Sequence, residues 1–345
     1  MRGELDVRQL GKTLCHEHLL FDLSGYLPDK NDSFHSPIEG LPVTIENLGA
    51  IRRDALLCRD NLMQLDSQLA VSEALLFRRA GGNTIVDCTT IGLKRDVRAL
   101  KKISEATDLN IIAGAGYYTD RFHPVDIHEK SAEDLAIQMI DEIQNGVDGS
   151  GIRCGIIGEI GTSWPITTDE RRVLKAAVYA HQKTRAPINI HPDPYEKQGH
   201  CVLDILEQEG ADLSRVVMSH TDASGFDTKY HMSLAERGCY VEFDGFGSEF
   251  HYDSMGSDQT FPGKGQRDQT DIERIASVCA LLRAGYASQI LLSHDVCLKM
   301  QLRAFGGYGY DHLLINIIPS LRKSGVKDDQ LNQMLIENPM GMLGF

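Results

Sequence analysis

The sequence predicts an α/β fold, a (β/α)8 TIM barrel built as a single domain over residues 1–345. Short β-branched segments alternate with longer amphipathic segments along the whole chain, and eight segments of the first kind recur at similar spacing. Alternating strands and helices imply a parallel sheet with right-handed crossovers, and eight strands close into a barrel. An open doubly wound sheet is the alternative. We favour the barrel because no G-x-G-x-x-G motif follows the first strand segment.

The expected strands are apolar, β-branched runs bounded by turn residues. They cover residues 13–21, 84–90, 110–118, 154–163, 187–193, 216–222, 239–247 and 289–297. Apolar residues at helical spacing predict helices over residues 67–80, 96–107, 132–145, 169–184 and 271–285. Gly81-Gly82, Gly210 and Gly285 stand where helix C-caps belong.

Two long irregular segments interrupt this alternation. Residues 25–60 contain Pro28, Pro37 and Pro42 and form an insertion after the first strand, and residues 249–268 follow the seventh strand. Loops of this length in a compact domain usually carry function. In a barrel both would lie on the catalytic face, and together with residues 117–127 and 299–310 they would set the substrate.

The composition and charge limit which classes of protein this chain can belong to. Hydrophobic residues make up 42% and charged residues 24%, as in an ordinary globular protein. The first residues lack the apolar run of a signal peptide, and no stretch of 18 uninterrupted apolar residues occurs, so we expect a cytoplasmic protein. The formal charge of −14, without a compensating basic stripe, argues against nucleic acid and anionic membrane as partners.

The eight cysteines are scattered singly, and none forms a C-x-x-C pair. Many lie inside apolar runs, where a free thiol behaves as a small hydrophobic side chain. This pattern favours reduced thiols over a disulfide framework, and it argues against a structural zinc cluster of cysteines.

Residues with metal-binding side chains follow the strands. In an enzyme barrel the carboxyl ends of the strands form the active site. Those positions are occupied here by His16, His18, Glu159, His191, His220 and Asp295. Because alternate residues of a strand share a face, His16 and His18 should point into the barrel together, while Glu17 points away.

Each of these residues also has an ordinary structural interpretation. The two histidines of the first strand could be solvated, Glu159 could be half of a buried salt bridge, and His191 or His220 alone would usually be a core histidine. A carboxylate among glycines and apolar residues costs several kcal/mol unless it is paired or bound to a metal. As a set, four histidines and two carboxylates supply six ligands, which suits two ions of zinc, manganese or cobalt.

The motifs around these residues resemble the phosphotriesterase group of the amidohydrolase superfamily, and most closely its phosphotriesterase-related branch. The matching motifs are TLCHEHL from Thr13, AGAGYY from Ala113, GEIG from Gly158, IHP from Ile190, SH from Ser219, LSHD from Leu292, YGY from Tyr308 and ENP from Glu337. The resemblance extends from about Gly11 to Asn338, nearly the whole chain.

The resemblance implies a distribution of ligands. His16, His18 and Asp295 would hold the buried α metal, and His191 and His220 the more exposed β metal. Glu159 occupies the bridging position, where the best-known phosphotriesterases have a carbamylated lysine. A glutamate bridges directly, but the difference puts a simple transfer of organophosphate hydrolysis in doubt. Zinc is the first expectation for the two divalent ions, with manganese or cobalt as alternatives.

The resemblance also implies a mechanism, hydrolysis by a metal-bridging hydroxide. Asp295 would accept the proton of the nucleophile and pass it to the leaving group. Tyr118 would hold a substrate oxygen, contact the metal-bound hydroxide, or pack at the barrel rim. Lys299 and Arg303 would bind an anionic group of the substrate or remain as solvated surface charges. His294 would orient this region or simply pack.

Three functions are compatible with these residues, all with a small-molecule ligand. The favoured one is a hydrolase of lactones or other carboxylic esters, with phosphotriester hydrolysis as a promiscuous side activity. An amidohydrolase of N-acyl amino acids or acylated sulfonates is the second. The third is a ligand-binding barrel without catalysis, which the complete ligand set argues against. Homodimers are common among barrel enzymes of this resemblance, so a homodimer is compatible with the sequence, although nothing in the composition proves one.

Overall fold

The computed structural model describes residues 2–27, 37–193, 195–252 and 266–345. Eight strands form one sheet in the order in which they occur along the chain, and all neighbouring pairs with a recorded register are parallel. They are β1 (Thr13–Glu17), β4 (Thr84–Asp87), β5 (Asn110–Ala115), β6 (Ile156–Gly161), β7 (Ile188–His191), β8 (Val216–Met218), β9 (Tyr240–Phe243) and β12 (Ile290–Leu292).

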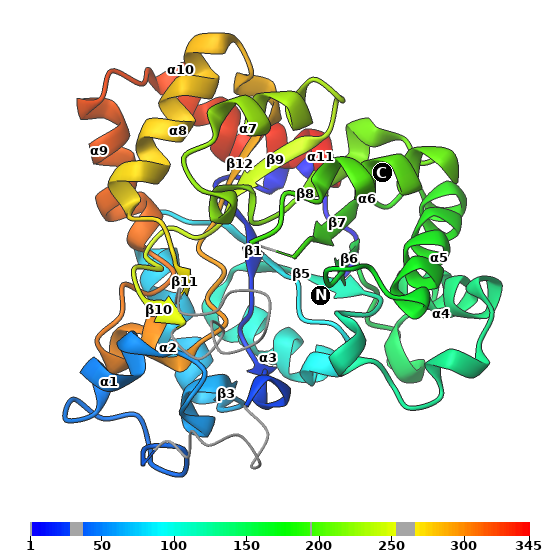
Figure 1. The fold of residues 1–345 in the computed structure, drawn as a ribbon, viewed down its shortest axis with the longest axis horizontal. Helices are drawn as coiled ribbons and strands as arrows, with labels where there is room; N and C mark the ends of the chain where they lie inside the picture. Colours follow the sequence, from blue (N-terminus) through cyan, green and yellow to red (C-terminus); the bar gives the residue numbers. More distant parts are fainter. Residues whose placement is uncertain (1, 28–36, 194, 253–265) are drawn as a thin grey trace.

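The ends of this sheet meet. The backbone N–H of Asp295, after β12, donates to the carbonyl oxygen of His16 in β1 over 3.2 Å. Sequential strand order and contact between the first and last strands define a (β/α)8 barrel, so the predicted fold is confirmed and the open sheet is wrong (Figure 1). Each observed strand lies inside its predicted segment and is shorter than it, because the residues after each strand turn into the loops of the barrel mouth.

Helices cover the outside of the barrel. Those between strands are α2 (Ser67–Arg79), α3 (Val97–Thr107), α4 (Ala132–Gln144), α5 (Thr168–Thr184), α6 (Gly199–Gln208), α7 (Thr228–Ala235) and α8 (Asp271–Ala284). The end of the chain adds α9 (Ile318–Lys323), α10 (Asp328–Asn332) and α11 (Asn338–Leu343), with wide π-helical turns at Leu313–Ile317 and Gln333–Glu337.

The helix boundaries follow from local sequence signals. Capping boxes begin α4, α5 and α8, in which Ser131, Thr167 and Thr270 each pair with an acidic residue three positions later. The predicted C-cap glycine Gly285 has φ 95°, in the left-handed region that terminates a helix. The five predicted helices are therefore confirmed to within two residues at each end. Helices α6 and α7, and those at the end of the chain, lie outside the predicted ranges, although the predicted C-cap glycine Gly210, with φ 90°, follows α6.

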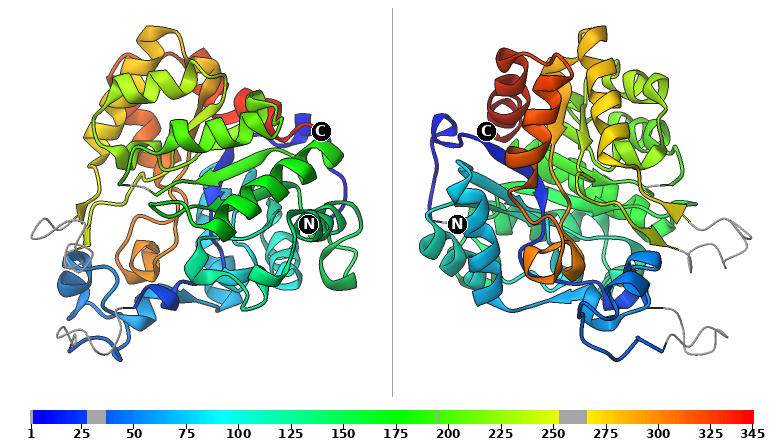
Figure 2. Two further views of the ribbon diagram at one scale, coloured as in Figure 1. Left: turned by 45° about the vertical axis from the view of Figure 1, so that its right-hand side comes forward. Right: turned by 90° about the vertical axis from the view of Figure 1, so that its left-hand side faces the viewer.

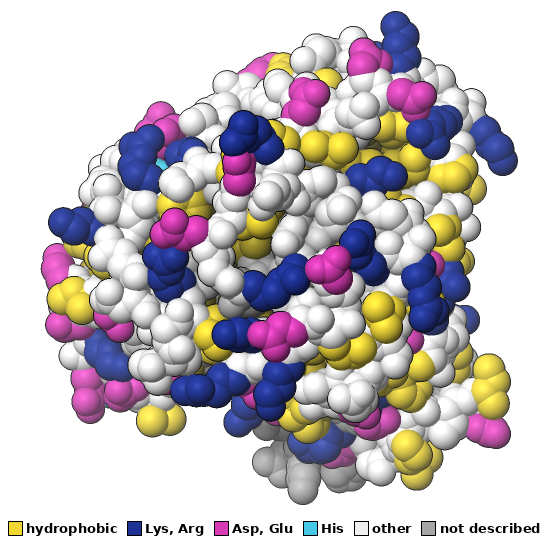
Figure 3. Space-filling model, turned by 180° about the vertical axis from the view of Figure 1, so that it is seen from behind, with side chains coloured by type: hydrophobic (Ala, Val, Ile, Leu, Met, Phe, Trp, Pro, Cys, Tyr) yellow, Lys and Arg dark blue, Asp and Glu magenta, His cyan; other side chains and the backbone are white. Residues whose placement is uncertain are grey.

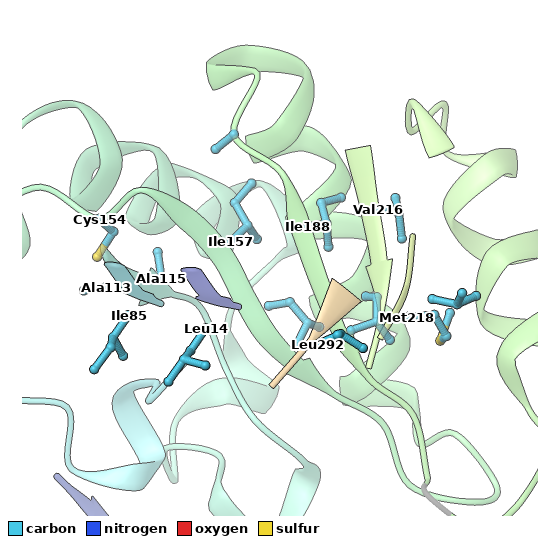
Figure 4. Packing of buried hydrophobic residues seen from close by; sticks show 14 of the residues in the cluster. Leu14, Ile85, Ala113, Ala115, Cys154, Ile157, Ile188, Val216, Met218 and Leu292 are labelled. Atoms are coloured by element: carbon cyan, nitrogen blue, oxygen red, sulfur yellow. The ribbon is translucent and has the colours of Figure 1, made fainter. Parts of the chain in front are cut away.

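The core lies between the strands and the surrounding helices. Leu14, Ile85, Ile157, Ile188 and Leu292 are fully or almost fully buried, and each comes from a different strand (Figure 4). Close packing of such side chains holds the barrel in one geometry. All eight cysteines are free, and six of them are buried, as the single spacing predicted.

The long segments predicted on the catalytic face come together at one end of the barrel. The first contains α1 (Leu48–Arg53) and is flanked by the paired strands β2 (Phe21–Asp22) and β3 (Met63–Gln64). The second contains the pair of β10 (His251–Tyr252) and β11 (Gln266–Arg267). A β-bridge between Asp54 and Tyr252 joins the two. Figure 2 shows α1 and the β10–β11 pair on the side of the barrel opposite to the two chain ends. Residues 28–36 and 253–265 of these predicted loops lie outside the described part.

The molecular surface carries both signs of charge. On the face in Figure 3, Lys and Arg side chains are intermixed with Asp and Glu side chains rather than gathered into one stripe. No helix in the described part of the chain has the length and apolar character needed to cross a membrane.

Candidate metal centre

The six predicted ligand residues converge in the structure. They come from the carboxyl ends of five strands, β1, β6, β7, β8 and β12. They lie at the floor of a pocket of about 570 Å³ at the barrel mouth, and His191, His220 and Asp295 line that pocket directly. His16, His18 and Glu159 lie deeper and are at most 2% exposed.

Two histidines of β1 form the deeper part of the cluster. His16 Nε2 lies 3.4 Å from Glu159 Oε2, and His18 Nε2 lies 3.2 Å from Glu159 Oε1. Asp295 Oδ1 approaches the same two ring nitrogens, at 3.3 Å from His18 and 3.8 Å from His16. Four donor groups therefore face one another in a volume suited to one cation.

The histidines of β7 and β8 form the part nearer the pocket. His191 Nδ1 lies 3.0 Å from Glu159 Oε2 and 2.6 Å from His220 Nε2. Since Glu159 contacts histidines of both parts, its carboxylate stands between them. Glu159 therefore lies within reach of both histidine groups, and its role as a bridge between two metal ions stays a prediction.

The backbone has unusual conformations beside Glu159 and at two of the other ligand residues. Gly158, before Glu159, has φ 125°, and a Cβ there would lie 2.3 Å from the carbonyl oxygen of Asn189 on β7. Only glycine fits such a close approach. His220 and Asp295 also have left-handed φ values, 51° and 48°. Such strain in residues other than glycine is concentrated at functional sites, where the surrounding structure maintains it.

Polar residues behind the histidines orient their rings. The carboxylate of Asp244, which follows β9, lies 3.0 Å from His220 Nδ1 and 3.2 Å from His16 Nδ1. Ser219 Oγ lies 3.1 Å from His16 Nδ1, and Thr89 Oγ1 lies 2.9 Å from His18 Nδ1. Partners on the outer nitrogen fix the tautomer, so that the inner nitrogen presents its lone pair.

Sequence reasoning missed Asp244, although it lies in the predicted strand over residues 239–247 and the rule that found the other carboxylates applies to it as well. A third buried carboxylate, Glu242, lies 3.5 Å from His16 Nδ1 and accepts a hydrogen bond from Ser219. Both belong to the segment Glu242-Phe243-Asp244 at the end of β9.

The electrostatics of the cluster keep its carboxylates ionised. Burial opposes ionisation of Glu159, but the charges of His16 and His191 outweigh it and hold the pKa of Glu159 well below its usual range. Burial likewise lowers the pKa of His18, yet hydrogen bonds to Asp295 and Glu159 raise that pKa to about 9. His191 is the exception, because burial and the charge of His220 lower its pKa. Most of the cluster thus attracts positive charge strongly.

The donor set fits divalent cations. His16 Nε2 is buried and has no hydrogen-bond partner in the described part of the chain. Two imidazole nitrogens face each other at 2.6 Å in His191 and His220, where a shared cation would use both lone pairs. Three groupings of described residues have ligand atoms within 4.8 Å of one another: His16 with His18 and Glu159, Glu159 with His191 and His220, and His16 with His220 and Asp244. Imidazole and carboxylate donors of this kind suit zinc, manganese and cobalt.

The other predicted site residues have different positions. The Tyr118 hydroxyl lies 3.1 Å from His191 Nε2, at the wall of the pocket. Lys299 forms an ion pair with Asp60, and Arg303 pairs with Asp311 over 3.1 Å. Neither cation is among the residues that line the pocket. The structure therefore brings Tyr118 to the site but does not bring Lys299 or Arg303 there.

His294 points away from the cluster. Its Nδ1 lies 2.7 Å from Glu17 Oε1, and its Nε2 accepts a hydrogen bond from the backbone N–H of Leu313. Glu17 also accepts bonds from the backbone N–H groups of His294 and Val296. This buried network connects β1 to the segment after β12 and places the His294 ring outside the ligand cluster.

Comparison with known proteins places the chain in a family. Residues 1–343 match the model of the phosphotriesterase family. The chain is 40% identical to an N-acetyltaurine hydrolase of Bos taurus, over 99% of this chain and 96% of that protein. The chain therefore belongs to the phosphotriesterase family.

Solved structures agree with this assignment. A resiniferatoxin-binding protein from Rhodobacter sphaeroides superposes with a TM-score of 0.93 at 35% identity, covering 99% of this chain and 93% of that one. A mutant of a lactonase from Deinococcus radiodurans that resembles phosphotriesterase superposes with a TM-score of 0.76 at 27% identity, covering 99% and 98%. The family, the barrel and the ligand cluster together mark the protein as a hydrolase.

Proposed function

We propose that this member of the phosphotriesterase family is a binuclear metal-dependent amidohydrolase that cleaves small N-acylated amines. The position of the Glu159 carboxylate between two groups of histidines, at the floor of an open pocket, carries this proposal. The choice of an amide is supported by the N-acetyltaurine hydrolase that is 40% identical over nearly its whole length.

The ligand residues divide between two ions. His16, His18 and Asp295 would hold one, His191 and His220 the other, and Glu159 would contact both. When bound, two divalent cations would lower the pKa of a shared water and polarise the acyl oxygen of the substrate. Zinc is the first candidate because imidazole and carboxylate are its common ligands, with manganese and cobalt as alternatives.

Asp295 would move the proton. Its carboxylate lines the pocket. Burial opposes ionisation of this carboxylate, but its hydrogen bond to His18 holds the pKa of Asp295 below its usual value. Asp295 is therefore ionised and can accept a proton. The attacking water gives its oxygen to the acyl carbon and a proton to Asp295, which passes that proton to the amide nitrogen as the C–N bond breaks. The products are a carboxylic acid and an amine, and when the acid gives its remaining proton to the amine they leave as a carboxylate and an ammonium ion. An amine is a poor leaving group unless protonated, so this transfer matters more for an amide than for an ester.

The Tyr118 hydroxyl would hold a substrate oxygen. It lies 3.1 Å from His191 Nε2 and also faces the pocket, so it can donate to an oxygen bound beside that histidine. Burial raises the pKa of Tyr118 well above its usual range, which keeps the hydroxyl protonated as a donor.

Hydrolysis of lactones or other carboxylic esters is the second candidate. It is supported by the likeness to the lactonase from Deinococcus radiodurans, and the same residues would serve it. Phosphotriester hydrolysis would be a promiscuous side activity. The unpaired cysteines further support a cytoplasmic location, and a homodimer remains our proposal for the assembly.

A panel of N-acyl amines and lactones tests the proposal. The protein is stripped with a chelator, resupplied with zinc, manganese or cobalt, and assayed for amine release with ninhydrin and for acid release with a pH indicator. Metal-dependent amine release from acylated amines is expected. Turnover of lactones with silent amides would overturn the amide assignment, and binding without turnover of either class would favour a non-catalytic barrel.

A further inference from the structure

The pocket above the candidate metal centre is lined by several aspartates and, among the described residues, by two arginines, Arg121 and Arg274. Aspartates on the wall would repel an anionic substrate. The state of each arginine therefore bears on which substrates can enter.

Arg274 is already neutralised. Its side chain is 2% exposed, and its Nε donates to Asp222, which is equally buried. Its Nη1 donates to the carbonyl oxygens of Ser248 and Gln269, and Asp271 lies 3.6 Å away. A buried guanidinium with these partners stabilises the loop after β9, and its charge is compensated by Asp222, so it is poorly placed to bind an anionic ligand.

Arg121 is exposed and, unlike Arg274, is not held by carboxylates or carbonyl oxygens of the described residues. It belongs to a 3-10 turn, Asp120–Phe122, that follows β5. Within the described ranges its guanidinium has no ion pair or hydrogen bond, and its nearest recorded contact is the face of Tyr26, with the guanidinium carbon 5.9 Å from the ring centroid. Among the described residues, Arg121 forms no ion pair with the neighbouring Asp120, whose carboxylate instead accepts a hydrogen bond from Thr167 Oγ1 over 3.2 Å.

A chain of aromatic residues connects Arg121 to the metal centre. The Tyr26 hydroxyl donates to the Tyr118 hydroxyl over 3.2 Å, and the Tyr118 hydroxyl lies 3.1 Å from His191 Nε2. Along the pocket wall the order is therefore His191, Tyr118, Tyr26 and the Arg121 guanidinium. A short substrate whose acyl group reaches the ligand cluster would extend its other end along these rings.

We propose that Arg121 is a specificity residue that binds an anionic group, a sulfonate or a carboxylate, on the amine side of the substrate. This inference rests on the proposed amide hydrolysis. Guanidinium forms bidentate, charge-assisted hydrogen bonds with oxyanions, and these are stronger than hydrogen bonds between neutral groups. The substrate class that follows is N-acylated amino acids and aminosulfonates of small size.

The test compares two nearly isosteric substrates. N-acetyltaurine carries the sulfonate, and 2-acetamidoethyl methyl sulfone replaces one of its charged oxygens with a methyl group. The kcat and KM values are measured for the wild-type holoenzyme and for Arg121→Gln and Arg121→Lys. The matched control is Arg98→Gln, which makes the same charge change on the exposed face of α3.

The wild type should prefer the sulfonate over the sulfone by about tenfold or more in kcat/KM, which is the value of one charge-assisted hydrogen bond. Arg121→Gln should remove the preference by raising KM for the sulfonate, with kcat nearly unchanged, because the contact is made equally in the ground state and the transition state. Arg121→Lys should keep part of the preference, and Arg98→Gln should behave as the wild type.

Two results would overturn the inference: a preference that survives in Arg121→Gln, or an equal loss of activity toward both compounds, which would indicate a structural role. If the wild type hydrolyses neither compound, the proposed amide hydrolysis fails. Calorimetric titration of the metal-loaded protein with the same two compounds then decides the role of Arg121 separately. Tighter binding of the sulfonate that Arg121→Gln abolishes would support it, and equal binding would refute it.

Discussion

Replacement of Asp244 by Asn should weaken metal binding although Asp244 is not one of the six ligand residues. Its carboxylate lies behind one histidine of each half of the cluster, 3.0 Å from His220 Nδ1 and 3.2 Å from His16 Nδ1, and it also accepts from the backbone N–H of His220. Asn has nearly the same shape, but one of its two terminal atoms is a donor. Whichever way the amide turns, its NH2 group faces an imidazole N–H.

The magnitude follows from these contacts. Loss of a carboxylate behind a metal-binding histidine lowers metal affinity by about ten- to a hundredfold, or about 1.4 to 2.7 kcal/mol. His16 retains Ser219 at 3.1 Å and Glu242 at 3.5 Å as alternative partners for Nδ1, whereas Asp244 is the side-chain partner of His220 Nδ1 within hydrogen-bond distance. We therefore expect the loss at one of the two histidines rather than the product of two losses.

Competition with a chromophoric chelator at fixed pH measures this affinity. Asp66→Asn serves as the control because Asp66 caps α2 at the surface, where Asn caps equally well. Unchanged affinity in a folded Asp244→Asn protein would refute the argument that Asp244 fixes the tautomer of the ligands. A folded state can be established by circular dichroism.

Four further predictions follow from the site. Glu159→Gln should lower metal content and activity together, and full occupancy with normal activity would refute its bridging role. The pKa of His18 near 9 means that protons compete with metal, so zinc affinity should rise from pH 6 to 9 and the metal-free protein should lose stability as pH rises from 6.5 through 9; a pH-independent affinity would contradict this. Arg274→Met should destabilise the protein by about 3 to 5 kcal/mol in urea unfolding, because it leaves the buried charge of Asp222 unpaired, and a double variant with Asp222→Leu should recover part of the loss. Tyr118→Phe should reduce kcat/KM at unchanged metal content; equal activity would exclude a role for the hydroxyl.

The sequence was sufficient to predict the barrel and the residues of the ligand cluster. Strand patterning is local, and the carboxyl ends of parallel strands must meet at one end of a barrel, so a histidine that follows a strand is placed by topology alone. His16 and His18 point inward together, and Glu17 points away into a network with His294, as period-two alternation requires.

What the sequence did not reveal depends on loops. Lys299 and Arg303 follow the last strand closely, but their partners, Asp60 and Asp311, come from segments whose path no local pattern predicts. Arg121 became visible as an unpaired pocket cation only when the turn after β5 was seen beside Tyr26. Loop residues are placed by long-range contacts, which periodicity and spacing do not encode.

Elemental analysis of the purified protein, after loading with metal and removal of excess metal, tests directly whether the ligand cluster is a binuclear metal centre. We expect about two divalent ions per chain and a clear decrease in His191→Ala, because the imidazole removed contacts both Glu159 and His220. A folded protein that binds no divalent ion after resupply would show that the cluster at the barrel mouth is not a metal centre.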